Sequence, residues 1–167
     1  MSKNTHLEHL EDDILNNGSA GGKASIAFLK SLGSMLSQGD SSNMKVTTKW
    51  DGAPAIVCGI DPTWETFFVG NKSVFAKTQP KICYSGDSVD QYYPDSGLNK
   101  ILKDCFKYLS KLDIRGVIQG DLLFTENTKN IVTVGGKLCV TFTPNTITYA
   151  IPLDTELGKR VKNSKIG

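Results

Sequence analysis

Apolar residues recur at helical spacing in three parts of the chain. These parts are 5–16, 22–38 and, with the clearest pattern, 97–111. Side chains three and four positions apart lie on one face of a helix, so each segment is predicted to form an amphipathic helix. The Asn-, Gly- and Ser-rich cluster at 16–22 is predicted to end the first helix. Residues 154–162 are predicted to form a fourth helix.

Runs rich in Val, Ile, Thr and aromatic residues predict the strands. They occupy 45–50, 53–59, 66–70, 116–124, 137–142 and 146–152. Asp51-Gly52 separates the first two runs, and an Asp-Gly pair at such a place predicts a β-hairpin. Residues 78–97 are rich in Pro, Gly, Asp and Tyr and are predicted to form a long loop. Helices interleaved with short, meandering strands predict an α+β fold with antiparallel sheets and flanking helices.

The length of 167 residues predicts a single domain able to bury its own core. We expect an N-terminal helical part at 1–42, a sheet core at 44–152 and a C-terminal helix at 154–163. No apolar run approaches the roughly 20 residues that span a bilayer, and the N-terminus lacks the apolar stretch of a signal peptide. A cytoplasmic protein without membrane contact is therefore expected. The cysteines have no metal-ligand or C-x-x-C spacing and are predicted to be small core residues: Cys58, Cys83, Cys105 and Cys139.

The segment V-T-T-K-W-D-G-A-P, at 46–54, is the strongest candidate for a nucleotide-binding site. A lysine that attacks a phosphoanhydride must lose its proton, and a buried strand end or a neighbouring positive charge favours that loss. We therefore expect Lys49 to be the chemically active residue and Gly52 to let the backbone approach a ligand closely. The alternative is a lysine beside an ordinary hairpin turn. Shuffling this composition would give roughly 0.1 K-x-D-G matches, so the context of the motif decides between the two.

Three further segments supply candidate ligands for a nucleotide. Asp121 stands in an otherwise apolar run and is predicted to bind Mg²⁺ or a ribose hydroxyl; the alternative is that it points to solvent. Lys72 and Ser73, together with Lys77, are candidates for phosphate binding, or else solvated surface. Tyr149 is a candidate for stacking on a base, or else a core aromatic residue.

Two other motifs near the N-terminus are weaker candidates for a functional site. His6 and His9 are three positions apart on a predicted helix, which permits a metal site, but no third ligand has a supporting spacing and the pattern favours a solvated acidic helix. The glycine-rich run that ends at Lys23 lacks the first glycine and the final Ser or Thr of a phosphate-binding loop and follows a helix, so we interpret it as a helix–helix turn.

In their order along the chain, these motifs resemble the adenylation domain of covalent nucleotidyltransferases, which include ATP-dependent DNA ligases, RNA ligases and mRNA-capping enzymes. The matching motifs are K-W-D-G at 49–52, K-S at 72–73, G-D-L-L at 120–123 and Tyr149. The resemblance implies that Lys49 forms a lysyl-AMP intermediate from ATP, with Mg²⁺ held near Asp121. It also implies that nucleotide is bound by Trp50, Asp51, Gly52, Lys72, Ser73, Asp121 and Tyr149. The acceptor would be a DNA or RNA end lying along the lysines of 72–81.

The whole chain also resembles an uncharacterised family encoded by T4-like and marine tailed phages, which implies action in a host cytoplasm. The phrases that carry this resemblance are H-L-E-H at 6–9, V-x-x-K-W-D-G-A-P at 46–54, F-V-G-x-K-S-V-F at 68–75, Q-G-D at 119–121 and T-P-N-T-I-T-Y at 143–149. Ala53-Pro54 replaces the ligase arginine that follows the glycine, and the last two superfamily motifs are not found. We therefore expect a truncated domain. Two alternatives stay open: a catalytically inactive nucleotide- or nucleic-acid-binding module that keeps the fold, and a phage structural or host-interaction protein.

Overall fold

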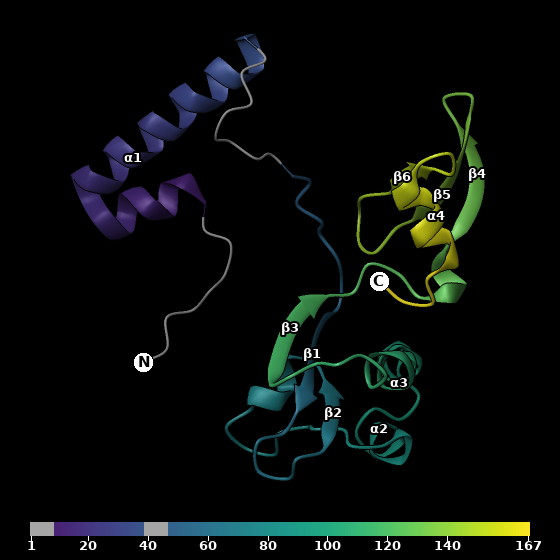
Figure 1. The fold of residues 1–167 in the computed structure, drawn as a ribbon. Helices are drawn as coiled ribbons and strands as arrows, with labels where there is room; N and C mark the ends of the chain where they lie inside the picture. The colour runs from purple at the N-terminus through teal and green to yellow at the C-terminus, as the bar shows by residue number, and fades with distance from the viewer. Residues whose placement is uncertain (1–8, 39–46) are drawn as a thin grey trace. The chain divides into compact units, whose positions relative to one another are not determined.

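The computed structural model describes residues 9–38 and 47–167, and the chain divides into two compact units, Met1–Lys49 and Trp50–Gly167. In the described part of the first unit, helix α1 (Leu10–Gln38) bends sharply at Gly18, where φ is 55° and ψ is −129°. The two arms of α1 fold back on each other (Figure 1), and Ser25 donates a hydrogen bond from its hydroxyl to the Leu10 carbonyl at 3.2 Å. The predicted break between two helices is thus confirmed, at Gly18.

The second unit contains two three-stranded antiparallel sheets and three α-helices. The first sheet has the strand order β2–β1–β3 and the second has the order β4–β5–β6. The elements are β1 (Ala55–Ile60), β2 (Phe67–Gly70), α2 (Gly86–Tyr92), α3 (Gly97–Leu109), β3 (Val117–Asp121), β4 (Asn130–Val134), β5 (Lys137–Phe142), β6 (Tyr149–Pro152) and α4 (Glu156–Asn163), with 3₁₀ turns at Lys72–Phe75 and Glu126–Thr128. The predicted α+β class with antiparallel sheets is confirmed.

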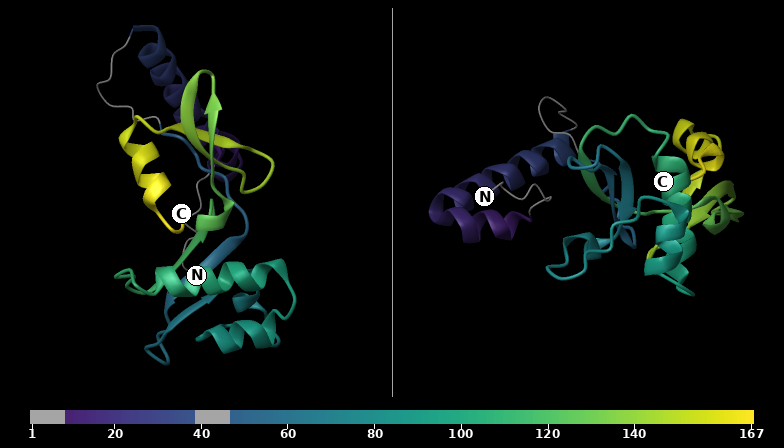
Figure 2. Two further views of the ribbon diagram at one scale, coloured as in Figure 1. Left: turned by 90° about the vertical axis from the view of Figure 1, so that its right-hand side faces the viewer. Right: turned by 90° about the horizontal axis from the view of Figure 1, so that it is seen from below.

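Each sheet of the second unit has its own core. Helices α2 and α3 lie side by side near the first sheet (Figure 1 and Figure 2), and Leu102 and Cys105 of α3 pack with Ile56 and Cys58 of β1. The core of the second sheet is built from its own strands, α4 and Phe124. All four cysteines are buried and unpaired, as the sequence predicts.

The predicted hairpin at Asp51-Gly52 is wrong. Residues 47–54 form no strand, and β1 begins only at Ala55. Gly52 lies instead against the end of β3, where a Cβ on this residue would come within 2.5 Å of the Leu122 carbonyl oxygen. A glycine is therefore needed at this position because two backbones approach closely, and not because the chain makes a two-residue turn.

Two further elements differ from the prediction. Residues 78–97 are not one loop, because they contain α2, which Ser85 and Ser88 begin with a reciprocal capping box. Strand β4 was not predicted. The helices α3 and α4 and the strands β2, β3, β5 and β6 lie where the sequence places them, with ends that shift by a few residues.

Candidate functional site

An open pocket of about 360 Å³ lies at one end of the first sheet. The antiparallel register places Ala55 opposite Asp121 and Val57 opposite Gly70. The start of β1 and the ends of β2 and β3 therefore meet at the same end of the sheet. The pocket is lined by Gly52, Pro54, Ala55, Asn71, Lys72 and Asp121. Gly52, Lys72 and Asp121, three of the residues predicted from sequence, are thus brought together.

Gly52 fixes how closely the pocket wall approaches β3. A Cβ at this position would lie 2.5 Å from the Leu122 carbonyl oxygen and 3.0 Å from Cβ of Asp121. The next residue, Ala53, donates its N–H to the same Leu122 carbonyl at 3.0 Å, and Leu122 donates its N–H to the Pro54 carbonyl at 3.0 Å. The segment before β1 is therefore held against β3 by backbone hydrogen bonds on both sides of the cis Ala53–Pro54 peptide.

Asn71 is held in the pocket by two hydrogen bonds to its side-chain carbonyl. Its Oδ1 accepts the Ser73 N–H at 2.9 Å and the Tyr93 hydroxyl at 3.1 Å. The Tyr93 hydroxyl also pairs with the Ser73 hydroxyl at 2.6 Å. Burial raises the pKa of Tyr93, so its hydroxyl stays protonated and can donate. Because both partners occupy the carbonyl side of the amide, the NH₂ group of Asn71 is left to serve as a donor.

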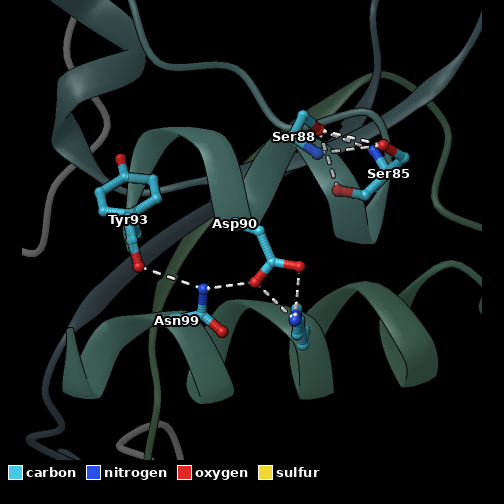
Figure 3. A network of polar contacts seen from close by, with 6 residues as sticks. Ser85, Ser88, Asp90, Tyr93 and Asn99 are labelled. Atoms are coloured by element: carbon cyan, nitrogen blue, oxygen red, sulfur yellow. Dashed lines mark hydrogen bonds and ion pairs between the residues drawn. The ribbon is translucent and has the colours of Figure 1, made fainter. Parts of the chain in front are cut away.

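The position of Tyr93 is set by the junction between α2 and α3 (Figure 3). The Asn99 amide donates to the Asp90 carboxylate at 2.9 Å and to the Tyr93 carbonyl at 3.1 Å. Lys103 pairs with the same carboxylate of Asp90 at 2.6 Å. Tyr93 itself is only 8% exposed and packs in the core of the first sheet. The helices thereby place the hydroxyl that orients Asn71.

The charged residues of the pocket are complementary to a phosphate with a bound cation. Lys72 and Asp121 are both exposed, and neither forms an ion pair within 9–38 and 47–167. Lys72 and the Asn71 amide supply donors that suit a phosphate oxygen, and Asp121 supplies a carboxylate. Mg²⁺ is commonly held by one or two carboxylates together with substrate phosphates, so the residues present fit that ion.

A second group of predicted residues gathers beside Tyr149 of β6. The Asp51 N–H donates to the Tyr149 hydroxyl at 2.9 Å, and this hydroxyl lies 3.3 Å from the Asp51 carbonyl. Asn145 donates its side-chain amide to the Asp51 carboxylate at 2.8 Å. The rings of Trp50 and Tyr149 are 5.0 Å apart, and Tyr149 stacks on Phe142 at 5.4 Å. These side chains anchor the segment before Gly52 to the second sheet.

Besides Trp50, Asp51 and Tyr149, two more predicted residues, Lys49 and Ser73, lie outside the pocket wall. Lys49 is exposed and is the last residue of the first unit, whereas every lining residue belongs to the second unit. The strand that was expected to bury Lys49 is not formed at 47–50. Ser73 turns towards Tyr93 and supports Asn71 from behind the pocket. Of the lysines in 72–81, Lys81 donates to the Tyr92 carbonyl at 3.2 Å, and Lys72 and Lys77 are exposed.

The metal site that the spacing of His6 and His9 permits includes His6, which lies outside the described residues. Among residues 9–38 and 47–167, no cluster of three or more His, Cys, Asp and Glu side chains has a metal-binding arrangement. Within the same ranges, no helix has the length and apolar character needed to cross a membrane.

Sequence reasoning missed Asn71, Tyr93 and Asn145. Asn71 had one local signal, since Asn is favoured immediately before a helical turn, and it is the N-cap of the 3₁₀ turn at Lys72–Phe75. Tyr93 and Asn145 act through partners that are 20 to 94 residues away in the chain. Contacts over such separations leave no periodic signal in one sequence.

Comparison with known proteins identifies the family of the chain. No curated protein and no solved structure matches it. A family model matches residues 4–167. Because this match covers nearly the whole sequence, the chain belongs to DUF6267, a family of unknown function.

Proposed function

We propose that the pocket at the end of the first sheet binds the phosphates of ATP, and that the protein is a nucleotidyltransferase-like domain in which Lys49 takes AMP from ATP. The observation that carries this proposal is the pocket itself. It gathers Lys72, the Asn71 amide, the Asp121 carboxylate and the close-packed backbone of Gly52 from three separate segments. The volume of about 360 Å³ is within the range of small-molecule sites.

In the proposed reaction, Nζ of Lys49 attacks the α-phosphorus of ATP. The neutral amine forms a P–N bond, the P–O bond to the β-phosphate breaks and pyrophosphate leaves, and the nitrogen then releases one proton to water. The order of motifs, which resembles that of ligase and capping-enzyme adenylation domains, supports this chemistry. Lys49 is three residues before Gly52, and three residues span at most about 11 Å of chain. The covalent chain therefore keeps the backbone of Lys49 within that distance of Gly52.

Lys72 and Asn71 would contact phosphate oxygens, and a bound Mg²⁺ beside Asp121 would neutralise phosphate charge. The exposed lysines Lys72 and Lys77 would contact the backbone of the DNA or RNA end that accepts AMP. We expect this reaction to take place in the cytoplasm, which is that of the host if the protein is phage-encoded.

A second candidate function is nucleotide binding without covalent transfer. One observation favours it: Lys49 is exposed and is not among the lining residues of the pocket. This second function requires the same pocket but no lysyl-AMP.

Two measurements on the full chain separate these functions. The first is incubation with Mg²⁺ and ATP labelled at the α-phosphate, followed by a denaturing gel. Nucleotidyl transfer predicts a labelled band that Lys49→Ala abolishes and that Lys159→Ala, an exposed lysine change on α4, retains. The second is titration with ATP and Mg²⁺ followed by thermal stabilisation. Lys72→Ala is expected to weaken this binding by roughly tenfold or more, since a hydrogen bond to a charged group is worth about 1.5–3 kcal/mol.

Tyr93→Phe is a milder test of the same pocket, because it removes only the hydroxyl that orients Asn71. Stabilisation by ATP without a label would assign the second function. If the chain acquires no label and ATP does not stabilise it, both proposed functions are overturned.

A further inference from the structure

The turn that follows β2 exposes a phenylalanine. Phe75 is the last residue of the 3₁₀ turn Lys72–Phe75, and it is 66% exposed. From position 65 to position 111 it is the only large apolar residue that is exposed. The core of a protein–protein interface is a contiguous apolar patch, and this stretch of the chain supplies no such patch around Phe75. A ligand that suits this residue is therefore one that covers a single aromatic ring.

The two residues before Phe75 hold the turn in place. Val74 packs against the backbone of Gly70, where an added Cβ would lie only 2.4 Å from Cγ1 of Val74. The Ser73 hydroxyl pairs with the hydroxyl of the buried Tyr93 at 2.6 Å. Phe75 is therefore presented to solvent on a backbone that is already fixed. Binding to a preorganised side chain loses little entropy from ordering the protein.

Lys72 lies on the same side of this turn as Phe75. A 3₁₀ helix has three residues per turn, so positions three apart eclipse each other, with a rise of about 6 Å between them. Lys72 lines the pocket proposed for ATP, whereas Phe75 does not. The exposed ring is therefore a neighbour of the phosphate pocket and not a part of its wall.

The charges that flank Phe75 in the chain are all positive. Residues 66–86 include three lysines and no Asp or Glu. Lys81 is occupied, because its ammonium group donates to a backbone carbonyl at 3.2 Å. Lys72 and Lys77 are exposed on either side of Phe75, and neither forms an ion pair within 9–38 and 47–167. Two cationic side chains are thus available to a ligand that carries negative charge next to a flat ring.

We propose that Phe75 stacks on a base of single-stranded DNA or RNA, and that Lys72 and Lys77 contact the phosphates on either side of that base. Proteins that bind single strands combine an aromatic ring, which takes the face of a base, with cations that follow the backbone. The bases of a duplex already stack on each other, so the surface selects an unpaired strand. The inference rests on the proposed function, in which a DNA or RNA end accepts AMP, and it adds that this end is single-stranded and is held by Phe75.

The probes are fluorescein-labelled oligothymidylate and oligouridylate of about 12 nucleotides, a length within the site sizes of single-strand binders. Their binding to the full-length chain is followed by fluorescence anisotropy at fixed salt concentration. A third strand has the same deoxyribose-phosphate backbone with abasic residues throughout. Phe75→Ala is expected to weaken binding of the strands with bases by roughly 5- to 100-fold, the effect of losing one stacked base. It is expected to leave binding of the abasic strand unchanged, and Phe75→Trp is expected to keep the wild-type affinity.

Trp64→Ala is the matched control for Phe75→Ala. Trp64 is 70% exposed, but it lies in the loop at the other end of β2, between the acids Asp61 and Glu65. Its removal should leave strand binding unchanged. The salt dependence separates stacking from charge: Lys77→Ala should reduce the slope of log K against log salt by about 0.7, whereas Phe75→Ala should lower the affinity without changing the slope. Because the abasic strand is tested on the wild-type chain, the comparison stands even if a variant fails to fold.

Equal binding of the abasic strand and the strands with bases would overturn the proposal, and so would equal effects of Phe75→Ala and Trp64→Ala. Self-association of the wild-type chain, seen by analytical ultracentrifugation and removed by Phe75→Ala, would assign the ring to a second copy and overturn it as well. Binding of only one of the two probes would identify the strand as DNA or as RNA.

Stabilisation by ATP keeps this test separate from that of the proposed function. Phe75 does not line the ATP pocket, so Phe75→Ala should leave stabilisation by ATP unchanged. ATP stabilisation without strand binding overturns the stacking role alone. Strand binding that depends on Phe75, in a chain that ATP neither labels nor stabilises, overturns the proposed function and leaves the stacking role in place.

Discussion

Gly52→Ala tests whether the close approach of the K-W-D-G segment to β3 is as tight as the structure shows. The added Cβ would lie 2.5 Å from the Leu122 carbonyl oxygen and 2.9 Å from the carbonyl carbon, whereas real Cβ atoms essentially never come within 3.0 Å of a neighbour. Both neighbours are backbone atoms of a paired segment. They cannot rotate away as the end of a flexible side chain can.

The cost follows from the required movement. The two backbones must separate by roughly 0.5 Å, a gap that forfeits a sizeable part of each local packing contact. The hydrogen bond from Ala53 to Leu122, now 3.0 Å, would lengthen to about 3.5 Å, beyond the normal range. Overpacking costs about 1–3 kcal/mol and a weakened hydrogen bond about 1 kcal/mol. We therefore expect a loss of about 2–4 kcal/mol.

Urea unfolding followed by circular dichroism measures this loss. With a slope of about 1–3 kcal/mol per molar urea for a small domain, the midpoint should fall by roughly 1–2 M. Gly120→Ala is the matched control, because a Cβ there meets nothing within 4 Å. It should leave stability unchanged or raise it by up to about 1 kcal/mol. A loss below about 0.5 kcal/mol for Gly52→Ala, or an equal loss for both variants, would refute the close-approach argument.

Two other regions give predictions of the same kind. Lys129 donates to the carbonyls of Val161 at 2.7 Å and Lys162 at 2.9 Å near the C-terminus of α4, so Lys129→Met should lower the free energy of unfolding in urea by about 2 kcal/mol. Lys159→Met, on the exposed face of α4, should change that free energy little, and equal effects of the two variants would contradict the capping role. The hydrogen bond from Tyr84, at 2.6 Å, and that from the Thr63 N–H hold the pKa of Asp61 below its usual value. A carboxylate with a lowered folded-state pKa contributes stability above its unfolded pKa of about 4 and loses that contribution as the pH falls through the folded value. In thermal melts between about pH 3 and 6, the stability advantage of the wild type over Asp61→Asn should therefore shrink towards acid pH, and an advantage that stays constant would contradict it.

The elements that sequence could predict are those with a strong local signal. Helix α3 has a polar face, an apolar face that carries Leu102 and Cys105, and an N-cap at Ser96. Each of these features can be recognised from residues that are close together in the sequence. Helix α2 was missed because it has only seven residues and buries one side chain, Val89. Strand β4 is exposed at all five positions, so no alternation between buried and solvent-facing residues marked it.

The same Asp-Gly pair shows where local inference fails. In sequence, Asp51-Gly52 between two β-rich runs indicates a hairpin, because nothing local distinguishes a turn glycine from one that a distant backbone crowds. The partner that decides the outcome, Leu122, is 70 residues away. Gly52, Lys72 and Asp121 were nonetheless predicted to belong to one site, and the structure brings all three to one pocket. That prediction rested on the order of motifs and not on their local structure.

The register of the first sheet explains why these three residues meet. Ala55 pairs with Asp121 and Val57 pairs with Gly70, so the segments that enter β1 and leave β2 and β3 share one end of the sheet. A one-residue slip of β3 would turn Asp121 to the opposite face, away from Lys72. The close contact at Gly52 and its two flanking hydrogen bonds oppose such a slip. The glycine of the motif therefore has a structural reason to be there, whether or not Lys49 reacts. The labelling experiment, and not the presence of the motif, decides that question.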